Sequence, residues 1–180
     1  VFLVRFAPVA QLSGVYTIPG SYPTIAAAVT AVNAVGVSGH VYFNIAAGHT
    51  ENAPVGGIIL QFAGGVPVGN QSNAAQTITF QKSGAGANPL INAFTGTQAA
   101  NSAVSLDGIF KIVGVDYVTI RSIDLAEIAG NASDPNYMEM GYGLLRASAT
   151  NGTQNCSIRN CVITLNNQHT GVWPASLSPF

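Results

Sequence analysis

The sequence predicts an all-β chain wound into a solenoid of stacked coils, with one capping α-helix at its N-terminal end. Two observations carry this prediction. The stretches DYVTIRSIDLAE (116–127) and QNCSIRNCVITL (154–165) begin 38 residues apart, place apolar residues at matching positions and break their alternation at the same point. Only one early segment of the chain has the apolar periodicity of a helix.

The repeated break in alternation indicates a corner. One extra residue, at Arg121–Ser122 and again at Arg159–Asn160, lets the chain turn while the next side chain still points inward. Successive hairpins need no copied bend, but successive coils of a solenoid do. We therefore expect the two copies to stack as neighbouring coils around one core. The expected inward residues are Val118, Ile120, Ile123 and Leu125, then Cys156, Ile158, Cys161 and Ile163.

The expected helix spans about residues 23–36. Ser21 or Thr24 can cap its N-terminus, and Gly36 can end it. A helix at this place would cover the apolar end and the strand edges of the first coil. Its apolar stripe consists of Ile25, Val29 and Val32.

The rest of the chain predicts short strands, because bursts rich in Val, Ile, Thr and Phe are bounded by Gly, Asn, Ser and Pro. Residues 126–141 interrupt this order and are expected to form a lateral loop, a place where function often lies. The expected strands lie within His40–Ile45, Gly57–Phe62, Thr77–Phe80, Pro89–Phe94, Ile109–Gly114, Tyr117–Leu125, Tyr142–Ser148 and Cys156–Leu165.

Residues 1–14 have two interpretations. Val1–Ala10 is similar to the apolar part of a secretion signal, with PVA before Gln11 similar to a cleavage site, or the segment is a first strand. Residues 15–180 are expected to form one β-helix domain, which we interpret as the N-terminal part of a longer protein.

The composition restricts the partners. Only 7% of the 180 residues are charged, against roughly 25% in ordinary soluble domains. Six basic and seven acidic residues offer no basic patch for nucleic acid. No apolar run reaches the roughly 18 residues of a membrane span. Cys156 and Cys161 lack zinc-site spacing and are expected to be free, small buried side chains, with a disulfide as the alternative.

Several segments together resemble a known family. YTIPGSYPTIAAAVTAVNAVGVSGHVYFNIAAGHTE, TITFQKSGAGANPLI, VDYVTIRSIDL and NCSIRNCVITLNN are similar to the N-terminal part of large secreted bacterial proteins with a right-handed parallel β-helix of the pectin-lyase-like kind. Many such proteins are cargo of the type IX secretion system. The resemblance covers about Gln11–Asn167 and implies a secreted or cell-surface protein. It implies no reaction, since this fold hosts lyases, hydrolases, adhesins and structural proteins.

The acidic residues predict no catalytic centre. A polysaccharide hydrolase of this kind needs carboxylates gathered on one face, for an acid and a base. Asp124 and Glu127 are close in sequence, but the second copy has Val162 and Leu165 at their positions. We assign no catalytic residue, no metal ligand and no cofactor, and we favour a protein without enzymatic activity.

Six residues are candidate contacts to a glycan. Arg121 and Arg159 are expected to stack one coil apart on the outer face with Asp124 near, where they can clasp an acidic sugar. Alternatively, Arg121 only pairs with Asp124 or with turn carbonyls. The three candidate stacking platforms for sugars are Tyr137, Tyr142 and Trp173.

Three functions remain open. The first is a non-catalytic extracellular or cell-surface β-helix that acts in adhesion or as a structural or filament component. The second is a lyase or hydrolase of polysaccharides whose active coils lie beyond this segment, and the third is a glycan-binding module. The expected partners are a polysaccharide, the secretion machinery, and another copy of the chain added end to end.

Overall fold

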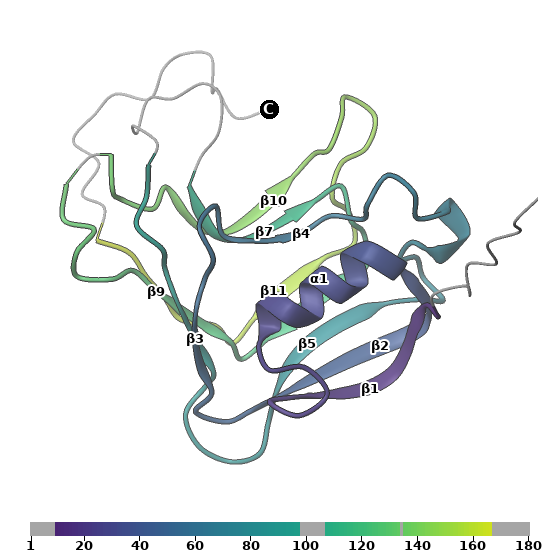
Figure 1. The fold of residues 1–180 in the computed structure, drawn as a ribbon, viewed down its shortest axis with the longest axis horizontal. Helices are drawn as coiled ribbons and strands as arrows, with labels where there is room; N and C mark the ends of the chain where they lie inside the picture. The colour runs from purple at the N-terminus through teal and green to yellow at the C-terminus, as the bar shows by residue number, and fades with distance from the viewer. Residues whose placement is uncertain (1–9, 98–106, 134, 167–180) are drawn as a thin grey trace, which may run out of the picture.

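The computed structural model describes residues 10–97, 107–133 and 135–166. These residues are mostly β, with one α-helix, α1 (Ile25–Val35), and one short 3-10 helix, η1 (Val68–Asn70). The strands pair in parallel within three sheets, which Figure 1 shows as three sides around the interior. The prediction of a parallel all-β architecture is confirmed at this level.

The five-stranded sheet has the order β1-β2-β5-β8-β11, formed by Leu12–Ile18, Val37–Ala46, Ile78–Ser83, Val118–Arg121 and Ser157–Arg159. The four-stranded sheet has the order β12-β9-β6-β3, formed by Ile163–Thr164, Asp124–Ala126, Leu90–Asn92 and Thr50–Asn52. The three-stranded sheet has the order β10-β7-β4, formed by Met140–Leu145, Gly108–Val113 and Ile58–Leu60. From β2 onward, the chain visits the three sheets in turn.

The two copies of the repeated pattern lie side by side, as expected. Ile158 pairs with Ile120, Arg159 with Arg121, and Ile163 with Leu125. The corner is copied in the backbone as well. Ser122 and Asn160 follow the paired arginines and have left-handed φ values of 56° and 55°. Non-glycine residues adopt this conformation rarely, so the matching pair explains the phase break of the sequence.

The predicted helix is present and slightly shorter than expected. Thr24 caps it by accepting a hydrogen bond at Oγ1 from the Ala27 N–H (3.0 Å), and it ends at Gly36, whose φ is 71°. The apolar stripe is buried, and α1 contacts β1, β2 and β4. Among the described residues, no helix is long and apolar enough to cross a membrane.

Aromatic rings form a continuous stack through the core. The centroids of Phe43 and Phe80 lie 4.8 Å apart in a stacked pair, and Phe80 meets Phe110 edge-on at 5.8 Å. Tyr16 extends the stack beyond Phe43, and Tyr142 extends it beyond Phe110. Each ring comes from a different strand, so the stack ties successive passes of the chain together.

The side chains of the last described strands, β11 and β12, are less buried than those of the strands they pair with. Leu125 is 1% exposed, but its paired residue Ile163 is 48% exposed. Cys156 and Cys161 are free and half-buried. We expected full burial for both cysteines; they are half-buried because β11 and β12 are the edge strands of their sheets and no described strand lies beyond them.

Other expectations are only partly tested. β1 begins at Leu12, and residues 1–9, most of the segment interpreted as either a secretion-signal remnant or a first strand, lie outside the described residues. The expected lateral loop is observed between β9 and β10, where the described residues 127–133 and 135–139 form neither helix nor strand.

We expect Phe80→Ala to lower the free energy of unfolding by about 3–5 kcal/mol, because it removes a fully buried ring from the middle of the aromatic stack. Urea unfolding followed by circular dichroism measures this. Thr79→Ala, on the other face of the same strand, is the control and should cost about 1 kcal/mol or less. Equal losses for the two variants would contradict the importance of the stack.

Candidate functional site

The carboxylates share one structural role. Six of the seven acidic residues lie in the described part of the chain, and each accepts a backbone N–H from another segment or from the loop beside it. They are Glu51, Asp107, Asp116, Asp124, Glu127 and Glu139. Because backbone amides at corners have no strand partner, these carboxylates satisfy donors that otherwise lack an acceptor.

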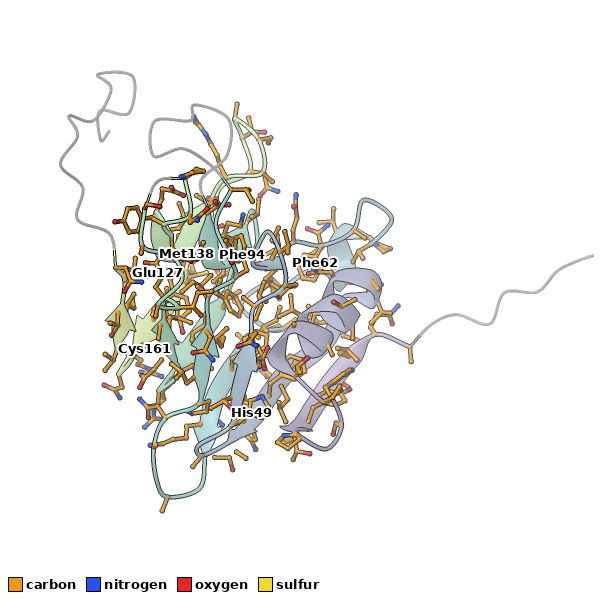
Figure 2. All side chains as sticks on the ribbon, turned by 60° about the vertical axis from the view of Figure 1, so that its left-hand side comes forward. His49, Phe62, Phe94, Glu127, Met138 and Cys161 are labelled. Carbon is orange, nitrogen blue, oxygen red and sulfur yellow. The ribbon has the colours of Figure 1, made fainter. Side chains whose placement is uncertain are left out.

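Glu127 shows this role most fully. Its Oε1 accepts from the Met138 N–H in the lateral loop, and its Oε2 accepts from the Asn166 N–H, both at 2.6 Å. Figure 2 shows Glu127 and Met138 beside each other. Both carboxylate oxygens are therefore engaged with the backbone.

Two aspartates join segments next to paired strands in the same way. Asp116 Oδ1 accepts from the Gln154 N–H (2.6 Å), and Asp124 Oδ1 accepts from the Val162 N–H (2.9 Å). The Asn88 side-chain amide also donates to Asp124 Oδ1 (2.8 Å). The predicted site residue Asp124 is thus a link between three corners.

Glu51 holds the N-terminus of α1. Its carboxylate accepts from the N–H groups of Ile25 (2.6 Å) and Ala26 (3.1 Å), where the helix dipole favours negative charge. His49 Nε2 lies 3.0 Å from Glu51 Oε2. Figure 2 places His49 apart from Glu127, near the other end of the molecule. Within the described residues, no three His, Cys, Asp or Glu side chains gather as metal ligands.

Arg121 and Arg159 are brought together as predicted. They occupy paired positions of the adjacent parallel strands β8 and β11, and both side chains are exposed. In the described part of the chain, neither guanidinium forms an ion pair with Asp124 or any other carboxylate. Whether they contact a glycan stays a prediction.

Sequence reasoning missed most of the surface around these arginines. On the outer face of the five-stranded sheet, one row of paired residues consists of Thr17, Asn44, Gln81, Arg121 and Arg159. A second row on the same face consists of Val15, Tyr42, Thr79, Thr119 and Ser157. We call these two rows the outer polar face. Alternation in HVYFNI (40–45) and TITF (77–80) is a signal that could have placed Tyr42, Asn44 and Thr79 outward, but the pairing of the rows was not visible in the sequence.

Tyr137 lies at a surface hollow in the lateral loop. The hollow has a volume of about 440 Å³ and is lined by Tyr137, Ala129, Ala132 and Asn166. The Tyr137 hydroxyl donates to the Ala132 carbonyl (2.8 Å), which fixes the ring against the loop. Tyr137 as a sugar platform stays a prediction.

Tyr142 has a different environment from Tyr137. Its ring packs 5.9 Å from Phe110, and its hydroxyl donates to the Ile123 carbonyl (2.9 Å). Burial raises the pKa of Tyr142 far above the usual range, with further contributions from Cys161 and Asp124. The ring belongs to the aromatic stack, and its role toward a sugar stays a prediction. Trp173 lies outside the described residues.

The Cys156 thiol faces the interior side of the corner. Burial raises its pKa, a hydrogen bond with the backbone at Val118 opposes this, and Asp116 raises it further. A thiol held protonated in this way is a weak nucleophile and behaves as a small, partly buried apolar side chain.

Comparison of the chain with protein-family models, with curated proteins and with solved structures finds no match. The resemblance to pectin-lyase-like proteins and to type IX cargo therefore stays a prediction.

We expect the stability of the protein to fall as the pH rises above about 10, in part because the unfolded chain ionises Tyr142 there while the folded chain holds its proton. The contribution of Tyr142 is complete below that pH and is lost at up to roughly 1.4 kcal/mol per pH unit above it. Urea unfolding at several alkaline pH values, with Tyr142→Phe for comparison, measures this. Identical pH dependence of the two proteins would contradict it.

We expect Glu127→Gln to lower the free energy of unfolding by about 1–3 kcal/mol, because one backbone N–H then faces an amide NH2 instead of an oxygen. Hydrogen exchange at the Met138 and Asn166 amides should become faster. Tyr137→Phe in the same loop is the control. Unchanged exchange at both amides would refute the linking role of Glu127.

Proposed function

We propose that this chain is a non-catalytic right-handed parallel β-helix with α1 as its N-terminal cap, acting outside the cell or at its surface, in adhesion or as a structural component.

Topology and pairing support the coiled fold. Successive strands enter three different sheets, and each sheet collects its strands in parallel from successive passes of the chain. Connections between parallel strands of one sheet are right-handed in about 98% of cases, which supports the proposed hand.

Polar contacts of α1 support its role as a cap. Asn33 Nδ2 donates to the Ile59 carbonyl (2.7 Å), and Asn33 Oδ1 accepts from the Gln61 N–H (2.9 Å). A further strand at the edge of β4 would hydrogen-bond to these same backbone groups. The Asn33 side chain therefore takes the place of a strand partner. Glu51 fixes the other end of α1 to β3.

One observation carries the non-catalytic part: every described carboxylate accepts a hydrogen bond from a backbone N–H, in a turn, in a loop or at the start of α1. A glycosidase needs one carboxyl group that protonates the leaving oxygen and a second that acts on the opposite side of the sugar. The carboxylates of Glu127 and Asp124 instead hold the loop and the next strand. A polysaccharide-active enzyme with its catalytic coils outside this segment is the alternative.

Exposed apolar residues at the last strands support end-to-end association. Ile163 and Leu144 are large side chains left partly in water next to the edges of β12 and β10. Unpaired parallel edges with apolar neighbours favour the addition of further strands. A second copy of the chain is one source of such strands. Secretion and contact with the secretion machinery are proposed from the sequence resemblance alone.

The proposal is tested by light scattering after size exclusion over a range of protein concentrations, together with a reducing-end assay on a panel of polysaccharides. We expect a mass that climbs with concentration and no new reducing ends. Ile163→Lys should lower the mass, because it places a charge on the exposed apolar end. Val15→Lys, which changes an exposed residue of the outer polar face, should not.

Two results would overturn the proposal in separate parts. A constant monomer mass for the unmodified chain and for Ile163→Lys would contradict the proposed end-to-end association. Release of reducing ends from any polysaccharide would contradict the proposed lack of catalytic activity and favour the enzymatic alternative.

A further inference from the structure

We propose that the outer polar face binds an anionic polysaccharide, with Arg121 and Arg159 holding its carboxylate or sulfate groups. This names the ligand class for the adhesive role and therefore rests on the proposed function.

Arg121 and Arg159 concentrate positive charge on the outer polar face. Arg121 and Arg159 are directly paired on adjacent strands, and like charges at such positions destabilise a sheet. Only six of the 180 residues are basic, so this pair uses a third of them. Among the described residues, no carboxylate forms an ion pair with either arginine; Asp124, the acid nearest to Arg121 in sequence, accepts hydrogen bonds from the Val162 N–H and the Asn88 side chain instead. An anionic ligand would supply the missing countercharge.

The spacing of the two arginines suits the binding of oxyanions. Neighbouring parallel strands lie about 4.8 Å apart, so the two side chains leave the sheet at that spacing. Guanidinium groups bind carboxylate and sulfate oxygens through two parallel N–H donors. Two such groups at this spacing can share one oxyanion or hold the charged groups of successive sugars.

The neighbouring positions extend the surface beyond the arginines. Gln81, paired with Arg121, donates from Nε2 to Asn44 Oδ1 (2.9 Å), so the row continues as amides. The parallel row presents the hydroxyls of Tyr42, Thr79, Thr119 and Ser157. Amides and hydroxyls are the groups that hydrogen-bond sugar hydroxyls, and none of the paired positions of the outer polar face carries a negative charge.

Tyr42 adds an aromatic surface to the same face. It is 38% exposed on β2, at the other end of the hydroxyl row from Ser157. A ring with an apolar body and a polar tip suits contact with a sugar. The distance from Tyr42 to the arginines spans several strands, which favours an extended polymer over a small ligand.

The low total charge favours a polysaccharide over other anionic polymers. Nucleic acid binding depends on many simultaneous phosphate contacts, and anionic membranes are bound by clusters of four to eight basic residues. Two arginines among amides and hydroxyls match a polymer whose charges are separated by neutral hydroxyl-bearing atoms.

The test measures binding of the chain to heparin and alginate, with uncharged dextran as the comparison polymer. We expect binding to the two anionic polymers and none to dextran. Arg121→Gln and Arg159→Gln should each weaken binding about tenfold, since charge-assisted hydrogen bonds are lost. Arg121→Lys should weaken it less, because it keeps the charge but loses the paired donors.

Arg146→Gln is the matched control, because it removes the same charge from an exposed arginine just beyond β10, in a different sheet. Its affinity should equal that of the unmodified chain, and all variants should remain folded at the temperature of the binding measurement. Binding should also fall steeply with added salt.

Three results would overturn the proposal: no binding to either anionic polymer, equal loss in Arg146→Gln, or tighter binding to anionic vesicles or DNA than to heparin and alginate. None of these results changes the mass series or the reducing-end assay. The proposed ligand and the proposed non-catalytic role therefore fail separately.

Discussion

The structure depends on one constraint: inward side chains of successive passes must stack in register. Side chains alternate with a period of two along a strand, so a slip of one residue would turn every apolar side chain toward water. Ile120 over Ile158 and Phe43 beside Phe80 show this register. Each corner must then turn the chain by the same amount, and the left-handed Ser122 and Asn160 do so at matching places.

The stacked register also decides where the few charges lie. Corners leave backbone N–H groups without strand partners, and carboxylates such as Glu127 and Asp124 accept from them. The negative charges of the described residues are therefore engaged with backbone amides in turns, loops and the start of α1. Arg121 and Arg159 instead stand outward on a sheet. This separation makes a nearly neutral chain locally positive on one face, without any large net charge.

The first and the last described strands differ in how their edges and apolar side chains are covered. At the first end, α1 buries its apolar stripe, Asn33 satisfies edge groups of β4, and Glu51 anchors the helix. At the last described strands, Ile163 is half exposed although its paired residue Leu125 is buried. A helix thus covers apolar side chains and edge groups of β4 at the first end, whereas the last described strands leave edges and apolar side chains exposed. The proposed association at the second end and the proposed ligand binding along the side are compatible, because they would use different surfaces.

The sequence by itself determined the β-rich class, the helix from Thr24 to Gly36, and the stacking of residues 116–127 on 154–165, because period-two alternation and a copied break are local signals. It also placed Arg121 beside Arg159. Only the tertiary structure decided the acceptor roles of the acids, the position of Tyr142 in the aromatic stack, and the alignment of Asn44 and Gln81 with the arginines. The earlier strands are separated by segments of different lengths and share no visible repeat, so their pairing follows from packing in three dimensions and leaves no mark at a constant spacing in the sequence.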